Sequence, residues 1–371
     1  MKKSSIKKEV KFKLGELFCG PGGIAIGASN SIVETSDKKY LIDHSWANDY
    51  HEDTCATYAH NFPDVKVICG DVTKLDIASL PKIDCFAYGF PCNDFSIVGE
   101  SKGMEGDFGG LYKFGVTVLD TFNPKFFVAE NVGGLSSANE GKALKKIVHD
   151  LSKAGKSGYD LTIHKYKLEE YGVPQNRHRI IIVGINKKLK LKYRVPAPTT
   201  AGNPVTTKQA LEKPPIPKNA LNNEQMNQSK VVVERLTYIK PGQNIWQTEL
   251  PPHLQLNVKG AKLSQIYKRL DPNKPSYTIT GSGGGGTHGY HYKEHRALTN
   301  RERARIQSFP DDYYFVGKFD SVRRQIGMAV PPVGAKVIFE SILKTFAGVE
   351  YESVPANILE NTAEDLTLPR D

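Results

Sequence analysis

The chain has 371 residues, of which 39% are hydrophobic, 24% charged and 9% aromatic. This composition is typical of a folded globular protein and excludes a collagen, a coiled coil and a wholly disordered chain. No apolar run approaches the roughly 20 residues that a membrane span requires, and the basic N-terminus is not followed by the apolar core of a signal peptide. We therefore expect a soluble, cytoplasmic protein that does not engage a membrane.

Positive charge is concentrated in one part of the sequence. The formal net charge is +10, and residues 186–300 contain 18 Lys and Arg against six Asp and Glu, so the rest of the chain is close to neutral. Segregated positive charge of this kind neutralises phosphate backbones and favours a nucleic-acid partner. The alternative is a basic surface that is merely solvated.

The five cysteines all lie in the first quarter of the chain, are odd in number and include no Cys-x-x-Cys pair. This pattern argues against a zinc module and against a disulfide framework. We expect most of them to be small buried hydrophobic residues.

The first half of the chain alternates between strand and helix patterns. A strand is predicted over 10–18, followed by a glycine turn at 19–23 and a helix from Ile24. Further short apolar runs, at 65–68, 83–88, 126–129 and 180–184, alternate with helical segments such as 54–61 and 143–151. The alternation predicts an α/β fold with a doubly wound, mostly parallel sheet.

The pattern changes after Gly184, where six prolines between Pro196 and Pro217 interrupt a Lys- and Asn-rich stretch. A second, smaller and irregular domain is predicted over 186–317, with a glycine-rich run at 281–286. A helix is expected to begin after Thr299 or Asn300, because Thr299 and Glu302 have capping-box spacing. The catalytic domain would comprise 1–185 and 318–347, including a last helix over 334–347, and residues 348–371 would form a frayed acidic tail.

Two features of the first half indicate a ligand site. The turn at 20–23 lets backbone approach a ligand closely, although its glycines lack dinucleotide-fingerprint spacing and no triphosphate-loop Lys follows. Asp49, after the second predicted strand, stands where an acidic residue in such folds binds ribose hydroxyls. An exposed turn aspartate is the alternative interpretation of that residue.

Reactive side chains follow three predicted strands. Cys92 follows the strand over 83–88 in a turn stiffened by Pro91, and is either a nucleophile or an inert thiol. Glu130 follows the strand over 126–129. Arg177 and Arg179 alternate in an extended segment, so both are expected to point the same way. Since ligands bind beyond the carboxyl ends of such strands, we expect the cysteine, glutamate and arginine side chains to converge.

With these residues in view, the chain resembles the DNA (cytosine-5) methyltransferases of bacterial restriction-modification systems over nearly its whole length. The family's motifs occur in order, as Phe18-Cys19-Gly20-Pro21-Gly22-Gly23, Phe90-Pro91-Cys92, Glu130-Asn131-Val132, Gln175-x-Arg177-x-Arg179, Arg301-Glu302-Arg303-Ala304-Arg305-Ile306-Gln307-Ser308-Phe309-Pro310-Asp311 and Gly327-Met328-Ala329-Val330-Pro331-Pro332. The basic stretch falls where the family has its target-recognition domain.

The resemblance implies a catalytic mechanism. Cys92 would add to carbon 6 of a flipped-out cytosine, and Glu130 would neutralise the charge that develops on the ring. Arg179 and Arg177 would orient and polarise the base. The activated ring would take a methyl group from S-adenosylmethionine onto carbon 5, leaving S-adenosylhomocysteine, before Cys92 is expelled.

The resemblance also implies binding residues. Those for S-adenosylmethionine are Phe18, Gly20, Pro21, Gly22, Gly23, Asp49, Tyr50, Asp71, Val72, Pro91, Leu111 and Val330, of which Leu111 and Val330 are open to interpretation as core residues. Those for DNA are Ser96, Thr278, Gly283, Gly284, Thr287, His288, Tyr290 and His291, unless the glycine run is simply a flexible loop. A metal site formed by His288, His291 and His295 is not expected, because no carboxylate or thiol is suitably spaced.

Two positions depart from the family pattern: Asn93 stands where Gln is usual, and Met328 where Asn is usual. The expected activity is methylation within a short specific double-stranded DNA sequence by a monomer, with a separately acting cognate restriction endonuclease as an expected partner. A tRNA-directed enzyme of the same fold and a DNA-binding regulator without turnover are the alternatives.

Overall fold

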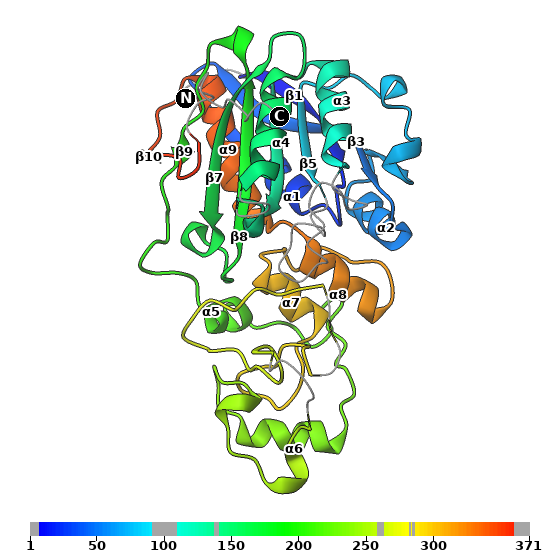
Figure 1. The fold of residues 1–371 in the computed structure, drawn as a ribbon, viewed down its shortest axis with the longest axis vertical. Helices are drawn as coiled ribbons and strands as arrows, with labels where there is room; N and C mark the ends of the chain where they lie inside the picture. The colour runs from blue at the N-terminus through cyan, green and yellow to red at the C-terminus, as the bar shows by residue number, and fades with distance from the viewer. Residues whose placement is uncertain are drawn as a thin grey trace, which may run out of the picture. The chain divides into compact units, whose positions relative to one another are not determined.

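The computed structural model describes residues 7–90, 110–136, 141–257, 263–281, 283 and 286–359. The chain divides into two compact units (Figure 1). The first comprises Met1–Lys167, His178–Pro198 and Gly334–Asp371, and the second comprises Leu168–Arg177 and Thr199–Val333. These limits differ from the predicted domains mainly because 168–177 and 318–333, expected in the catalytic domain, lie in the second unit.

The first unit is built on one eight-stranded sheet. Its strands are β1 (Lys8–Leu17), β2 (Ile32–Glu34), β3 (Lys38–Asp49), β4 (Lys66–Cys69), β5 (Cys85–Gly89), β6 (Phe126–Val132), β7 (Tyr159–Lys167) and β8 (His178–Asn186). They are ordered β2-β3-β1-β5-β6-β8-β7, with β4 also paired to β3.

The strand directions make the sheet mixed. The pairs β1 with β3, β1 with β5, β3 with β4 and β5 with β6 are parallel. The pairs β2 with β3, β6 with β8 and β7 with β8 are antiparallel. The predicted α/β class is confirmed, and the sheet predicted to be mostly parallel is parallel at its centre and antiparallel at both edges.

Helices cover both faces of this sheet (Figure 1). They are α1 (Gly23–Ser29), α2 (Glu52–Asn61), α3 (Tyr112–Phe122), α4 (Lys142–Lys153) and α9 (Pro332–Ala347). On one face, α3 and α4 contribute Leu119 and Ile147 to the main hydrophobic core. On the other, Phe346 of α9 packs against Phe12 and Phe126 at ring-centroid distances of 4.9 and 5.4 Å. Layered burial of this kind holds the central strand ends in place.

The second unit consists, over its described residues, of short helices joined by irregular segments. The α-helices are α5 (Thr207–Glu212), α6 (Lys230–Tyr238), α7 (Asn300–Ile306) and α8 (Phe319–Met328). The capping box predicted for α7 is confirmed: Thr299 and Glu302 each accept a hydrogen bond from the other's backbone N–H. Two small cores hold the unit together, one containing Leu236 and Tyr290 and the other Leu270 and Leu298.

The segment after α9 is docked rather than frayed, as far as residue 359. β10 (Ser353–Val354) pairs with β9 (Val195–Pro196), and Leu359 exchanges two backbone hydrogen bonds with Ile163, at 2.8 and 3.1 Å. The expectation of a frayed tail is therefore wrong for 348–359, because the apolar Leu359 packs against the main core. Residues 360–371 lie outside the described residues.

One stretch, Phe319–Ala347, is long and apolar enough to cross a membrane by length and composition alone. It comprises two helices, α8 and α9, separated by residues 329–331. Because 67% of its most apolar window is buried inside the protein, we assign it to the protein core.

Candidate active site

The ends of β5, β6 and β8 bring together an acidic and a basic side chain. Glu130 and Arg179 form an ion pair with Nε 2.8 Å from Oε1, and each side chain is only 13% exposed. Gly89, the last residue of β5, is opposite Glu130 in the sheet. A Cβ at Gly89 would lie 3.1 Å from Glu130 Oε2, so the chain leaves β5 against this carboxylate.

Strand direction explains why Arg179 reaches Glu130. β8 runs antiparallel to β6, so the beginning of β8 lies beside the end of β6, with Val132 opposite Arg179 and Glu130 opposite Ile181. Arg179 and Glu130 are therefore diagonal neighbours on one face of the sheet. Burial lowers the pKa of the Arg179 guanidinium, and Glu130 opposes that fall by stabilising its charged form.

Asn131 supports the same site and was not singled out from the sequence. Its side chain is 2% exposed, and its Nδ2 donates to the Phe90 carbonyl at 3.1 Å. This bond fixes the backbone directly before Pro91 and Cys92. The signal for this role was the motif position between Glu130 and Val132, but the target carbonyl could not be read from it.

Four predicted site residues, Pro91, Cys92, Ser96 and Gly284, lie outside the described residues, as does Asn93. The structure therefore describes this site up to Phe90: the end of β5, Glu130, Arg179 and the Asn131 hydrogen bond.

The glycine turn after β1 has the unusual backbone that its sequence suggests. Phe18, Gly20 and Gly22 have φ values of 53°, 54° and 88°. The turn is tied to β3 because Cys19 N–H donates to the Asn48 carbonyl at 3.0 Å. No atom lies within 4 Å of where a Gly20 Cβ would be, so the backbone there borders open space.

Asp49, the last residue of β3, also ties the glycine turn to the sheet. Its carboxylate accepts the Gly20 N–H at 3.0 Å and the His51 N–H at 3.1 Å. Burial raises the pKa of the Asp49 carboxyl, and these two donors counteract part of the rise. Tyr50, by contrast, is 63% exposed, with its ring 3.8 Å from that of His51 by centroids.

The other predicted cofactor residues have varied surroundings. Asp71 is exposed and accepts the Thr73 N–H at 2.9 Å, which lowers the pKa of its carboxyl. Val72 is a core residue, and Leu111 is half-buried against the same core. Val330 belongs to the second unit, where it is half-buried. Pro21 and Gly23 lie within the buried turn.

Arg177 does not play the part expected of it. Its side chain is 2% exposed and donates to the carbonyls of Ile279, Gly327 and Ala329 at 3.2, 3.0 and 3.0 Å. All three belong to the second unit. The expectation that Arg177 points with Arg179 toward the base is replaced by a structural role, because residues 168–177 fold with the second unit.

Gln175 also holds the second unit together, a role that was not predicted from the sequence. Its Oε1 accepts the Ile279 N–H at 2.9 Å, and its Nε2 donates to Gln307 Oε1 at 2.9 Å. The Gln-x-Arg portion of the motif therefore holds the segment that carries Thr278, whose hydroxyl donates to the Asn176 carbonyl at 2.6 Å.

The predicted DNA contacts divide by burial. Thr287, His288 and Gly283 are partly exposed, and Arg323 lies beside both His288 Nδ1, at 3.3 Å, and the Gly283 carbonyl, at 3.5 Å. Tyr290, however, is 1% exposed and stacks on Tyr267 at 5.4 Å. The prediction that Tyr290 contacts DNA is wrong, because its ring is buried in the core of the second unit.

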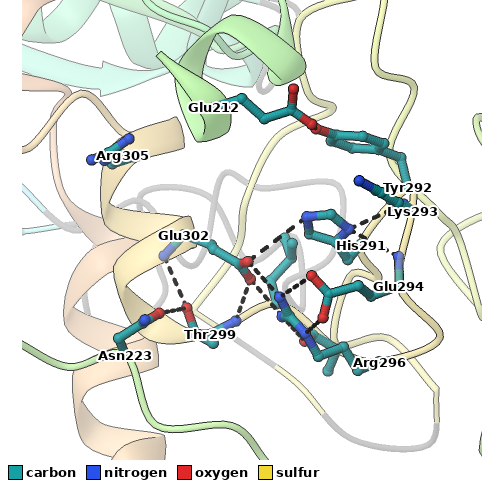
Figure 2. A network of polar contacts seen from close by, with 12 residues as sticks. Glu212, Asn223, His291, Tyr292, Lys293, Glu294, Arg296, Thr299, Glu302 and Arg305 are labelled. Carbon is teal, nitrogen blue, oxygen red and sulfur yellow. Dashed lines mark hydrogen bonds and ion pairs between the residues drawn. The ribbon is translucent and has the colours of Figure 1, made fainter. Parts of the chain in front are cut away.

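His291 is likewise buried, within a polar network centred on Glu302 (Figure 2). Its Nε2 lies 3.8 Å from Glu302 Oε1, while its Nδ1 accepts the Lys293 and Glu294 N–H groups. Arg296 donates to both Glu302 and Glu294. The expectation that His291 contacts DNA is wrong, since its polar atoms hold the turn at 292–296 onto α7. Among the described residues no group of three or more His, Cys, Asp or Glu is arranged to hold a metal.

Comparisons with known proteins agree with this geometry. A family model for the C-5 cytosine-specific DNA methylases matches residues 12–344. The Type II methyltransferase M.BbvI of Brevibacillus brevis is 57% identical over 355 residues, covering 93% of this chain and 94% of the relative. The Type II methyltransferase M.NgoFVII of Neisseria gonorrhoeae is 41% identical over 353 residues, covering 93% and 89%.

Solved structures show the same fold. A prophage-encoded protein from E. coli, classed as a DNA modification methyltransferase, matches with a TM-score of 0.69 and 25% identity over 90% of this chain and 99% of that one. The Entamoeba histolytica methyltransferase EhMeth matches with a TM-score of 0.59 and 16% identity over 91% and 99%, a likeness of fold alone. This chain thus belongs to the C-5 cytosine-specific DNA methylases and transfers a methyl group from S-adenosylmethionine to carbon 5 of cytosine in DNA.

Proposed function

We propose that Cys92 is the nucleophile and that Glu130 and Arg179 are the groups that act on the cytosine ring. The observation that carries this assignment is the 2.8 Å Glu130–Arg179 ion pair beside the end of β5, two residues before the Pro-Cys motif. A carboxyl and a guanidinium held together at a site that a flipped base enters can contact its ring edge.

The proposed reaction assigns each side chain one task. The Cys92 thiolate adds to carbon 6, which makes carbon 5 nucleophilic. Glu130 shares a proton with ring nitrogen 3 and so limits the negative charge on the ring, while Arg179 fixes both the carboxylate and the base. After carbon 5 has acquired the methyl group, loss of its proton expels Cys92.

The cofactor is assigned to the turn after β1. S-adenosylmethionine would supply a methyl group on a sulfonium, from which the neutral thioether S-adenosylhomocysteine leaves. Open backbone at Gly20, the exposed Tyr50 ring and the Asp71 carboxylate suit the methionine, adenine face and adenine amino group respectively. Asp49 would reach the ribose through lone pairs that its two backbone donors leave available. The further assigned residues are Phe18, Pro21, Gly22, Gly23, Val72, Pro91, Leu111 and Val330.

The second unit is proposed to recognise a short specific sequence in double-stranded DNA. Its support is the charge concentrated in 186–300 and the partly exposed Thr287 and His288. Phosphate contacts supply most of the affinity, whereas side chains and backbone at base edges supply specificity. The remaining assigned contacts are Ser96, Thr278, Gly283 and Gly284; Tyr290 and His291 are removed from the set.

We further infer that the enzyme works as a monomer in the cytoplasm, within a restriction-modification system whose endonuclease acts separately. The restriction-modification setting is supported by the relatives from B. brevis and N. gonorrhoeae, which are Type II methyltransferases. A monomer is the expectation for an enzyme that modifies one strand per encounter. The reaction as proposed uses no metal.

Bisulfite sequencing tests the activity and the site together. Mixed-sequence duplex DNA is incubated with the protein, with and without S-adenosylmethionine, and then sequenced after bisulfite treatment. Cofactor-dependent protection at one short motif is expected. If duplex DNA is not protected, the same assay is repeated on tRNA. Protection of tRNA would then point to an RNA substrate. A second assay, with 5-fluorocytosine in that motif, should trap a denaturation-resistant adduct that Cys92→Ala does not form.

A further inference from the structure

Two cysteines lie together behind Asp49. Cys55 belongs to the first turn of α2, and Cys69 is the last residue of β4. In the sheet, Cys69 is the partner of Asp49. The Cys55 thiol donates to the Asp49 carbonyl at 3.2 Å, and the same carbonyl accepts the N–H of Gly70, the residue after Cys69, at 2.9 Å. Three elements thus bring both cysteines to one backbone carbonyl.

The two thiols differ in access. Cys55 is 5% exposed, whereas Cys69 is exposed to solvent. Burial raises the pKa of the Cys55 thiol, and the neighbouring Cys69 thiol adds to the rise. Because Cys69 is the exposed thiol, a soluble reagent meets it first. Cys55 is placed to respond as the second, resolving thiol, and it does so slowly because its raised pKa leaves little thiolate.

We propose that Cys55 and Cys69 are a thiol modification site, at which a low-molecular-weight disulfide forms a reversible Cys55–Cys69 bond that weakens cofactor binding. The Cys69 thiolate attacks one sulfur of the reagent and releases one thiol. The Cys55 sulfur then attacks Cys69 Sγ, expelling the second thiol, which takes up the Cys55 proton. Two protein thiols are oxidised and one reagent disulfide is reduced to two thiols.

The effect on the cofactor follows from what Asp49 holds, and it rests on the proposed cofactor site. The Asp49 carbonyl accepts the Cys55 thiol and the Gly70 N–H, at 3.2 and 2.9 Å. A disulfide removes the thiol donor and draws the end of β4 toward α2. Gly70 leads into Asp71, so the two proposed cofactor carboxylates are displaced together.

Cys19 is the rival partner. It is 7% exposed, and its thiol interacts electrostatically with Cys55. Cys85 is fully buried in β5, where its thiol donates to the Lys13 carbonyl at 3.5 Å. Cys92 will react with any thiol reagent by virtue of its proposed role. The test therefore uses full-length Cys92→Ser protein and reads cofactor binding rather than turnover.

The Cys92→Ser protein is treated with glutathione disulfide and digested for peptide mass spectrometry, and its affinity for S-adenosylhomocysteine is measured by calorimetry before and after. We expect one linked peptide pair, Cys55 with Cys69, lighter by two hydrogens than the two free peptides. The affinity should fall by about tenfold and return after reduction with dithiothreitol. Cys19→Ser in this background should behave identically, whereas Cys55→Ser should carry only a mixed disulfide on Cys69.

A link from Cys55 to Cys19, or a mixed disulfide on Cys69 that never resolves, would overturn the proposed pair. Formation of the Cys55–Cys69 bond with unchanged affinity would overturn its effect on the cofactor. If the reduced protein failed to bind S-adenosylhomocysteine at all, the proposed cofactor function would fail, while the mass measurement would still decide whether the bond forms.

Discussion

The two arginines of the Gln-x-Arg-x-Arg motif show how adjacent residues of one motif acquire different tasks. Arg179 pairs with Glu130 in the first unit, and Arg177 donates to three backbone carbonyls in the second. The chain crosses from one unit to the other between them. Their alternation along an extended segment predicted that both side chains point the same way. The prediction fails because the boundary between the units falls between the two residues.

Substitutions at the two arginines should therefore have separable effects. Arg179→Ala is expected to lower kcat by roughly 10²-fold, because it removes a preorganised donor beside Glu130, with little change in the urea midpoint. Arg177→Lys is expected to lower the free energy of unfolding by about 1–3 kcal/mol, because buried carbonyls lose their donors. Its kcat at low temperature should stay within a few-fold. Equal losses of kcat in the two variants would contradict this division.

Glu16 is a buried acid under the cofactor turn. Its side chain is 1% exposed, and Tyr58 donates to its Oε2 at 3.2 Å. Burial raises the pKa of the Glu16 carboxyl from 4.5 to about 8, and the Tyr58 hydroxyl offsets part of that rise. Burial also lowers the pKa of His44, which lies 3.4 Å from the same hydroxyl, from 6.5 to about 4.

These two groups give a pH dependence whose sign can be worked out. Between pH 6.5 and 8 the folded protein keeps a proton on Glu16 that the unfolded chain has released, so stability falls as pH rises, by about 2 kcal/mol over this range. Near pH 6.5 His44 is half protonated in the unfolded chain and neutral in the folded protein, so it opposes this fall at the lower end of the range. Urea unfolding should therefore show wild type losing stability relative to Glu16→Gln as pH rises through this range. Exposed Glu34→Gln is the control, and an unchanged slope in Glu16→Gln would contradict the argument.

At the scale of elements, local patterns predicted much of the first unit. Runs of apolar residues marked β5, β6 and β8, and the Thr299–Glu302 spacing marked the start of α7, because these signals depend on neighbours in the chain. The antiparallel direction of β8 depends on its route through β7, which no local pattern contains. The burial of Tyr290 and His291 similarly depends on Tyr267 and Glu302, so a glycine-rich, polar sequence suggested exposure instead.

One close contact between strands gives a test of the central packing. A Cβ at Gly184 of β8 would lie 2.1 Å from the Phe127 ring of β6, in the middle of the main core. Gly184→Ala should therefore destabilise the protein by about 1–3 kcal/mol through overpacking. Gly70→Ala is the matched control, since a Cβ there meets nothing within 4 Å. Thermal or urea unfolding measures both, and equal midpoints would show that the ring can yield.

At the scale of the whole molecule, charge and chemistry occupy different parts of the chain. Most of the excess positive charge lies in the second unit, where residues 199–300 contain 13 Lys and Arg against six Asp and Glu, whereas the proposed nucleophile and the Glu130–Arg179 pair lie in the first unit. Most non-specific affinity for DNA comes from phosphate neutralisation, which does not need the nucleophile. Binding and turnover should therefore respond to different changes.

We expect Cys92→Ala to abolish methylation while leaving duplex affinity within a few-fold of wild type. For both proteins the logarithm of the association constant should fall linearly with the logarithm of salt concentration, with a slope of about −0.9 for each phosphate contacted. Fluorescence anisotropy with a labelled duplex measures the two slopes, which should coincide because the same basic residues meet the phosphates. Loss of binding in Cys92→Ala would mean that the nucleophile's surroundings hold the DNA, and a flat salt response would remove the electrostatic basis for assigning recognition to the second unit.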